Sequence, residues 1–207
     1  MKNSEKKYNR IVVGIDQSYK NTGITIAADG KIRRILSIKL EKLPNNSLKR
    51  KKLSKRLTRL LQRCKEKADS VIVIFERIRL ISQGFLNVEY IKNIGALNAV
   101  IIDVCNEFEI EVFSVDTRAW KSQIIGNSKP LENDMGINPE KYRTILWVIN
   151  QGFEDSILKE VSKKKTKGVF ERNGKRYTYN DDAADSAGIA LYGFIDERKQ
   201  KLKPERG

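Results

Sequence analysis

Residues 71–75 read Val-Ile-Val-Ile-Phe, and this apolar run constrains the fold more than any other feature of the chain. A strand with one face in water alternates apolar and polar side chains, whereas a strand covered on both faces is apolar throughout. The run therefore predicts a central strand between two layers of helices. That arrangement indicates an α/β protein.

Three consecutive strands are predicted before this central strand, over residues 10–16, 22–28 and 32–40. Asp29-Gly30 is typical of a tight hairpin turn between the last two of them. The spacing of apolar residues predicts further elements: helices over 47–67 and 87–108, a short strand over 111–115, and a helix that begins at Asp116 or Thr117. We therefore expect an α/β fold with a mixed five-stranded sheet flanked by helices.

The segment of about residues 126–180 has no clear place in this alternation and reads as an insertion. Helices are predicted over 142–149 and 157–161, and a hairpin over 168–179 that turns at Asn173-Gly174. The hairpin is expected either to overhang an active site or to extend the main sheet. We expect one domain over residues 1–207, with a flexible tail over 198–207.

Four acidic residues stand at the edges of apolar runs: Asp16, Glu76, Asp182 and Asp185. A carboxylate beside a buried run costs stability unless a positive charge offsets its desolvation. Each alone is more often a turn residue, a helix cap or the partner of a lysine. As a set they favour a metal site, because Mg²⁺ is held by carboxylate oxygens, and Asp182 and Asp185 would share one helix face.

The composition excludes several other chemistries. The two cysteines, Cys64 and Cys105, are isolated from each other, so neither a zinc site nor a disulfide framework is indicated. The sequence contains no histidine, which excludes a Ser-His-Asp triad and a zinc-protease helix. Catalysis at such a site would therefore depend on carboxylates and a metal ion, with help from lysine. We expect no small-molecule cofactor.

The chain is strongly basic, with 41 Lys and Arg against 26 Asp and Glu, a net charge of +15. Such a charge attracts polyanions, although charge alone would equally suit a ribosomal protein. The first residues lack the apolar stretch of a secretion signal, and no run reaches the roughly 20 apolar residues that cross a bilayer. We expect a cytoplasmic protein without membrane contact.

Basic residues gather on the outer face of the helix predicted over 47–67. A charged outer face is usually only solvated, but here nearly every exposed position has the same sign, which favours contact with a DNA backbone. The expected nucleic-acid contacts are Lys51, Lys52, Arg56 and Arg59 on this helix, with Arg77 and Arg79 after the central strand.

The acids lie in motifs that resemble those of the RuvC-type Holliday junction resolvases, members of the ribonuclease H-like superfamily. The resemblance rests on Gly14-Ile15-Asp16-Gln17-Ser18 with Thr22-Gly23, then Phe75-Glu76, then Asp182-Ala183-Ala184-Asp185, in the order of the family. It spans residues 10 to about 125 and 181–195. The length and lysine content look more like the resolvases of bacterial phages than the cellular enzyme.

This resemblance implies a ribonuclease H-like fold and a Mg²⁺-dependent endodeoxyribonuclease that resolves four-way DNA junctions by paired nicks. It implies two Mg²⁺ ions per site, with Mn²⁺ as a substitute, held by Asp16, Glu76, Asp182 and Asp185, and products with 5′-phosphate ends. Lys121 matches a lysine that the family places near the scissile phosphate. The family commonly has an aromatic residue shortly after the strand glutamate, where this chain has Arg77-Ile78-Arg79-Leu80.

A homodimer is expected on the helix predicted over 87–108. Its apolar residues spread over more than the stripe of about 100° that one sheet face requires, and Gly95 would permit a close approach. The alternative is that the 126–180 insertion covers this second face. Two other functions remain open: another ribonuclease H-like nuclease acting on branched DNA or RNA, and a non-catalytic basic nucleic-acid-binding protein.

Overall fold

The structure, a computed structural model, describes residues 7–77, 88–126, 137–161, 169–196 and 200–205. Its main sheet has six strands in the order β3-β2-β1-β4-β5-β9. The strands are β1 (Tyr8–Asp16), β2 (Asn21–Ala28), β3 (Lys31–Lys39), β4 (Ala68–Glu76), β5 (Glu111–Val115) and β9 (Leu202–Pro204). The chain is thus an α/β protein with a mixed sheet, as predicted.

Strand pairing explains how the sheet combines two directions. β1, β2 and β3 form an antiparallel hairpin series, and Asp29 and Gly30 make its second turn with φ of 49° and 77°. β4 is parallel to β1, and β5 is parallel to β4. The sixth strand, β9, pairs antiparallel with β5. The expected count of five strands did not include β9, which is formed by Leu202–Pro204.

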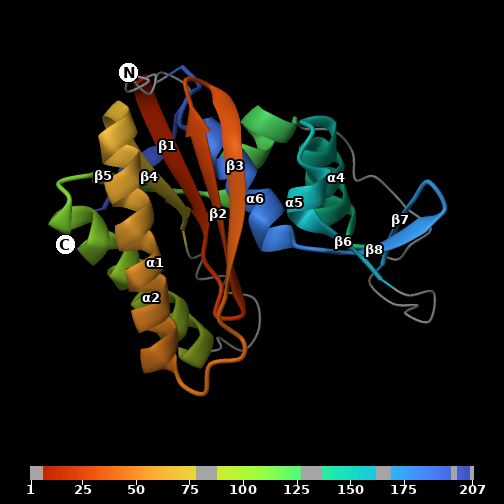
Figure 1. Cartoon of the computed structure of the whole chain (residues 1–207), viewed down its shortest axis with the longest axis horizontal. Helices are drawn as coiled ribbons and strands as arrows, with labels where there is room; N and C mark the ends of the chain where they lie inside the picture. The colour runs from red at the N-terminus through yellow and green to blue at the C-terminus, as the bar shows by residue number, and fades with distance from the viewer. Residues whose placement is uncertain (1–6, 78–87, 127–136, 162–168, 197–199, 206–207) are drawn as a thin grey trace, which may run out of the picture.

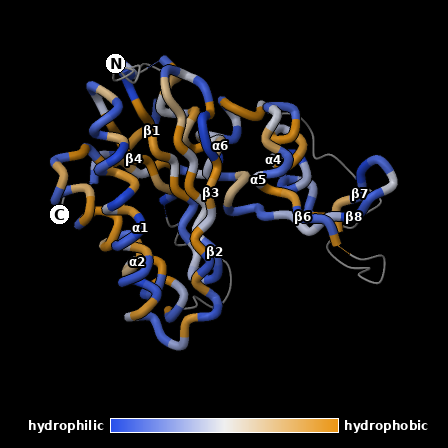
Figure 2. The backbone as a smooth tube through the Cα atoms, in the orientation of Figure 1, coloured by the Kyte–Doolittle hydropathy of each residue, from blue (hydrophilic) through white to orange (hydrophobic). Residues whose placement is uncertain are grey.

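Two layers of helices cover the sheet (Figure 1). Alternate residues of the central strands point to opposite faces. Val13, Ile15, Val73 and Phe75 pack with α1 (Asn46–Lys67) and α2 (Val88–Glu107), whereas Val12, Ile72 and Ile74 pack with Trp120 and α6 (Asp181–Tyr192). Figure 2 shows apolar residues along these strands and polar ones over much of α1. Both cysteines are buried and free.

The insertion forms its own small subdomain on the α6 side. It contains α4 (Pro139–Asn150), α5 (Glu154–Ile157), β6 (Leu158–Glu160), β7 (Phe170–Arg172) and β8 (Lys175–Tyr179). Its helix α4 and the Asn173-Gly174 hairpin are as predicted. A helix over 157–161 is wrong, because Leu158–Glu160 pairs with β8 as a strand.

Two placements were expected for the hairpin, and one of them, extension of the main sheet, is wrong. β6, β8 and β7 form a separate three-stranded sheet that extends outward from the body of the molecule (Figure 1). Helices α4 and α5 of the insertion pack on α6, through a core that includes Ile145, Ile157 and Ala184. Among the described residues, no helix is both long enough and apolar enough to span a bilayer.

Candidate active site

Asp16 and Glu76 lie at the carboxyl ends of two adjacent parallel strands. Ile15 of β1 pairs with Phe75 of β4, so the residues that follow them are level across the sheet. Each strand is apolar up to its last residue, which places the acid where the buried run meets solvent. The sheet alone therefore brings two of the predicted acids to one edge.

Helix α6 carries Asp182 and Asp185 to the same edge. Asn180 caps the helix by accepting a hydrogen bond from the Ala183 amide at 3.1 Å, and the side chain of Asn21 donates to Asn180 at 2.7 Å. The helix lies directly on the backbone of β1 and β2. A Cβ at Gly23 would stand 2.0 Å from the carbonyl oxygen of Asp182, and one at Gly14 would stand 2.4 Å from the Ala190 nitrogen.

The acids affect one another electrostatically. Burial raises the pKa of Asp16 well above its usual range, and the charges of Asp185, Glu76 and Asp182 raise it further. Burial raises the pKa of Asp182 to about 7, with contributions from Asp181 and Asp185. The four predicted acids are therefore brought into one cluster. A fifth, Asp181, belongs to its surroundings and was not singled out from the sequence.

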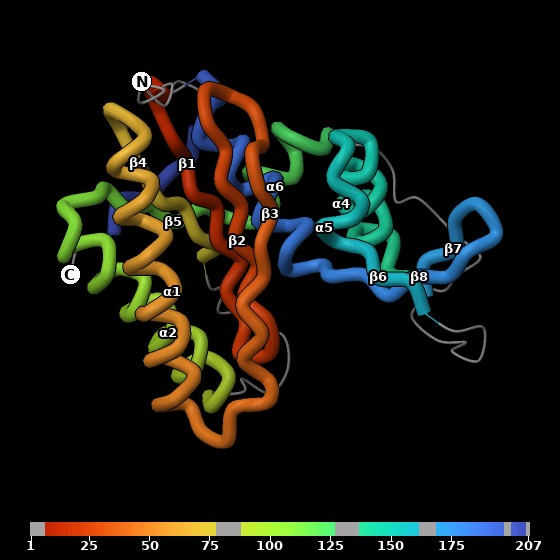
Figure 3. Tube along the Cα trace, viewed as in Figure 1, coloured from red at the N-terminus to blue at the C-terminus, as the bar shows by residue number. Residues whose placement is uncertain are grey.

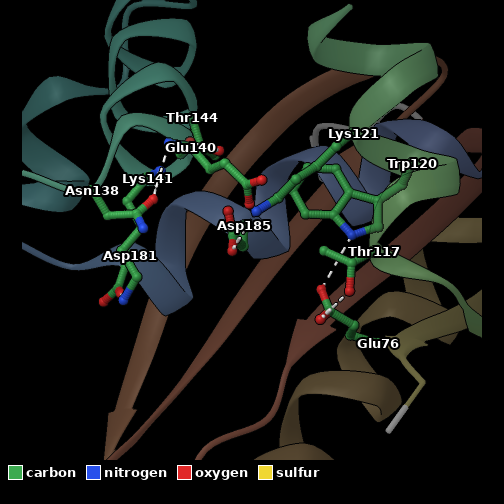
Figure 4. A network of polar contacts seen from close by, with 10 residues as sticks. All are labelled: Glu76, Thr117, Trp120, Lys121, Asn138, Glu140, Lys141, Thr144, Asp181 and Asp185. Carbon is green, nitrogen blue, oxygen red and sulfur yellow. Dashed lines mark hydrogen bonds and ion pairs between the residues drawn. The ribbon is translucent and has the colours of Figure 1, made fainter. Parts of the chain in front are cut away.

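Glu76 is held by two groups that the sequence did not single out. Its carboxylate accepts a hydrogen bond from the Thr117 hydroxyl at 2.6 Å and one from the Trp120 indole nitrogen at 3.2 Å (Figure 4). Thr117 and Trp120 form the short helix α3 (Thr117–Trp120) after β5. Trp120 is fully buried against Gly188 of α6, so one side chain connects Glu76 to the helix of the aspartates.

Lys121 lies beside the acids. Its ammonium is 3.5 Å from a carboxylate oxygen of Asp185, and both side chains are largely buried, at 22% and 17% exposure. Burial raises the pKa of Asp185 to about 6, while the charge of Lys121 opposes that rise. Lys121 begins the single wide turn η1 (Lys121–Ile125), and its ammonium also lies over the Trp120 ring.

Helix α4 of the insertion completes the surroundings. The buried Thr144 stabilises the charged form of Asp185 and so partly opposes the rise in the pKa of that carboxyl. Lys141 forms an ion pair with Asp181 (Figure 4). The adjacent pair Asp181-Asp182 was a visible signal for the fifth acid. No sequence signal pointed to Thr144, because its role depends on how the insertion packs.

No family model and no curated protein matches the sequence. Solved structures do. Thermus thermophilus RuvC in complex with a Holliday junction substrate superposes with a TM-score of 0.59 at 16% identity, covering 95% of this chain and 100% of that one. Thermus thermophilus RuvC alone gives 0.58 at 16% identity, covering 94% and 99%. The chain has the ribonuclease H-like fold of RuvC.

The acids of this RuvC-like fold suit a hard divalent cation by their chemistry, although they do not form a closed ligand shell. Among the described residues, no three acidic or sulfur-bearing side chains are grouped closely enough to hold a metal. Glu76 is directed to Thr117 and Trp120, and Asp185 to Lys121. Clustered carboxylates with raised pKa values are nonetheless the environment that a cation would stabilise, since it offsets their repulsion.

The predicted DNA contacts fall into three groups in the RuvC-like fold. Lys52, Arg56 and Arg59 line a groove between α1 and β3, whereas Lys51 lies on the same helix outside that groove. The guanidinium of Arg77 donates to the Ser114 hydroxyl of β5 at 3.3 Å. Arg79 lies outside the described residues.

Proposed function

We propose that the chain is a metal-dependent endonuclease that resolves four-way DNA junctions by paired, symmetric nicks. The observation that carries this proposal is the convergence of Asp16, Glu76, Asp182 and Asp185 at one edge of a RuvC-like sheet, with Lys121 beside them. The similar Thermus thermophilus RuvC is described in complex with a Holliday junction substrate. A basic chain with a net charge of +15 suits such a polyanion.

Asp16, Glu76, Asp182 and Asp185 would hold two Mg²⁺ ions, for which Mn²⁺ would substitute. When bound, such ions supply an activated water near neutral pH and stabilise the leaving oxygen, so that products carry 5′-phosphate ends. Thr117 and Trp120 restrict the orientation of Glu76. Lys121, through its ammonium, would contact the phosphate and stabilise its developing negative charge.

Tyr90 is a candidate for stacking on the bases at the junction. It is 59% exposed at the start of α2. Burial is the largest cause of its raised pKa, and the charges of Asp16, Glu76 and Asp182 raise the pKa further, so the ring lies near the acids. An exposed aromatic ring beside the cleavage site offers a face to any base. The chain lacks an aromatic residue directly after Glu76, and Tyr90 would supply the ring from a different element.

The homodimer is proposed on the outer face of α2. The described residues of the insertion pack on α6, on the opposite side of the sheet from α2, so this part of the insertion does not cover α2. A Cβ built at Gly95 would meet no heavy atom within 4 Å among the described residues, which leaves space for a second backbone. Paired nicks require two active sites, and a two-fold dimer supplies them.

A cleavage assay tests the proposed function. Purified protein is incubated with Mg²⁺ and a four-way junction, a fork, a flap or a linear duplex of matched sequence. Symmetric nicks in the junction that a ligase can seal support the proposal. Preferential cutting of fork or flap would favour the alternative of a different branched-DNA nuclease, which would use the same acids. Junction binding without cleavage of any substrate would favour a non-catalytic binding protein.

A further inference from the structure

A basic groove runs between α1 and β3, on the sheet face opposite α6. Its cavity volume is about 770 Å³. Helix α1 covers the centre of this face, and the remaining part over β2 and β3 stays open beside it. The side of the groove formed by α1, here called the α1 bank, includes Lys52, Arg56, Arg59, Arg63 and Lys67. The opposite side, the β3 bank, includes Arg33, Arg34 and Lys39. Among the described residues that line the groove, none is acidic.

The two banks have the same length. Arg33 to Lys39 covers about 20 Å at 3.3 Å per strand residue. Lys52 to Lys67 covers about 22 Å at 1.5 Å per helical residue. The cations of α1 recur every three or four residues, which places them along one side of the helix. Figure 3 shows the backbones of α1 and β3 running lengthwise, so the cations that line the groove form two rows along it.

The floor between the banks is apolar. It is formed by side chains that include Ile24, Ile26 and Leu36, of which Ile26 and Leu36 are only partly buried. Tyr8 lies at one end, with the Arg33 guanidinium 5.2 Å from its ring centroid. Cations along the rim and an apolar, aromatic floor are the two components of a surface that binds a single nucleic-acid strand.

We propose that this groove binds a segment of single-stranded DNA, with phosphates on the two banks and bases on the floor. A duplex keeps its bases inside the helix and offers the floor little apolar surface, which is why the occupant is a single strand. About 20 Å of groove accommodates at most about six nucleotides at the stacked spacing of about 3.4 Å, and fewer where the bases are unstacked. The site lies apart from the acids and requires no metal, so it goes beyond the proposed cleavage activity.

The Lys39 end of the groove lies at the same edge of the sheet as the acids. Lys39, at one end of it, pairs with Asn21 of β2, and Asn21 donates to the N-cap of α6. The Lys52 ammonium donates to the Lys39 carbonyl at 2.6 Å and joins the two banks at this end. The groove therefore begins near the sheet edge that carries the acids and runs away from it toward Tyr8.

Binding to a labelled oligothymidylate of about 12 nucleotides, a length typical of single-strand sites, tests the proposal in metal-free buffer. The groove variant is Arg56→Gln with Arg59→Gln. Its matched control is Arg50→Gln with Lys55→Gln, which removes the same charge from exposed positions of the same helix outside the groove. We expect at least tenfold weaker binding for the groove variant and less than a twofold change for the control. The salt slope should fall by about 0.7 for each phosphate contact that is lost.

Two further probes separate the possible sources of binding. An abasic oligonucleotide of equal length should bind the wild type more weakly than oligothymidylate does, and the groove variant should lose this difference. Equal losses in the groove and control variants, or no preference for bases, would overturn the proposal. If the groove variant lost more affinity for a matched duplex than for the single strand, the groove would instead bind the backbone of duplex DNA. Since no cleavage is measured, the outcome is independent of the nuclease proposal.

Discussion

The backbone of Gly23 lies directly against that of Asp182, so closely that a single methyl group would not fit between them. A Cβ at residue 23 would be 2.0 Å from the Asp182 carbonyl oxygen and 2.6 Å from the Ala183 nitrogen. These contacts set how near α6 comes to β2. The position of the aspartates relative to Asp16 therefore depends on the absence of a side chain on the neighbouring strand.

Gly23→Ala should push the first turn of α6 away from the sheet. Overpacking of this kind costs about 1–3 kcal/mol, and a displacement of about 1 Å at a catalytic group can lower the rate about 100-fold. We expect a folded protein with strongly reduced junction cleavage. Gly30→Ala is the control, because its φ of 77° also penalises alanine but no atom lies within 4 Å of the added methyl. Equal activity losses in both variants would contradict this view.

Asp16→Asn should retain the fold and junction binding while cleavage falls. The change removes the central charge of the cluster with little change in side-chain volume. The cleavage rate should therefore fall by more than the 10–100-fold that is typical when a hydrogen-bond partner of a metal ligand is removed. Mg²⁺ titrations of cleavage, together with junction binding in metal-free buffer, measure the two effects separately. Cleavage by this variant at the wild-type rate in Mg²⁺ would remove Asp16 from the active site.

The metal-free protein should become less stable as pH rises from about 4 to about 7. Asp182 and Asp185 have folded-state pKa values of about 7 and about 6, both above the ordinary value of 3.8. A raised folded pKa contributes stability at low pH that is lost as pH rises through it. The double variant Asp182→Asn with Asp185→Asn should lose less stability over this range, which thermal unfolding at several pH values measures.

The same experiment reports on metal binding. Mg²⁺ at neutral pH should raise the melting temperature of the wild type, by an amount that corresponds to about 2.7 kcal/mol when its concentration is 100 times the dissociation constant. The double variant should respond much less. Parallel pH curves for the two proteins, and equal responses to Mg²⁺, would show that these aspartates are not a coupled cation site.

Lys121→Gln should reduce cleavage about 100- to 1000-fold, the range typical for loss of one group that stabilises developing negative charge. Loss of its charge should also raise the pKa of Asp185 further and move the activity profile to higher pH. Lys141→Gln is the matched control. Lys141 of α4 pairs with Asp181, which lies on the same helix as Asp185, but the Lys141 side chain is about half exposed. We expect it to change cleavage less than threefold. Equal effects of the two variants would deny Lys121 a special role.

Gly95→Glu should separate the proposed dimer. The added carboxylate has space in the monomer but would lie in the interface, where it would be buried without a partner. Light scattering should give twice 23.8 kDa for the wild type and 23.8 kDa for the variant, with unchanged circular dichroism. A wild-type mass near 23.8 kDa at micromolar concentration, without DNA, would contradict the dimer.

The strands and the acids at their ends could be predicted because both depend on local pattern. The apolar runs that end at Asp16 and Glu76 are long enough to fix the strands. The spacing of Asp182 and Asp185 puts both on one side of whichever helix contains them. The central sheet and the four acids therefore follow from the sequence and from its resemblance to a known family.

The remaining features depend on distant partners. Leu158–Glu160 and Leu202–Pro204 are strands of three residues, too short for a periodic signal, and their conformation comes from pairing with β8 and β5. The contacts of Asp185 with Lys121 and Thr144 join elements far apart in the chain. The groove along α1 had a signal in its cations, but the apolar floor that distinguishes it from a solvated face is contributed by other strands.

Trp120 gives the molecule an internal optical probe. Its indole donates a hydrogen bond to Glu76, packs on Gly188 of α6 and lies beneath the Lys121 ammonium. The ring therefore contacts Glu76 at the end of β4 and also the helix that carries Asp182 and Asp185. An indole's emission responds to the charges and hydrogen bonds around its ring. The only other tryptophan is Trp147, on α4. With Trp147→Phe, the intrinsic fluorescence of Trp120 would follow any rearrangement of Glu76 or Lys121 without an added label.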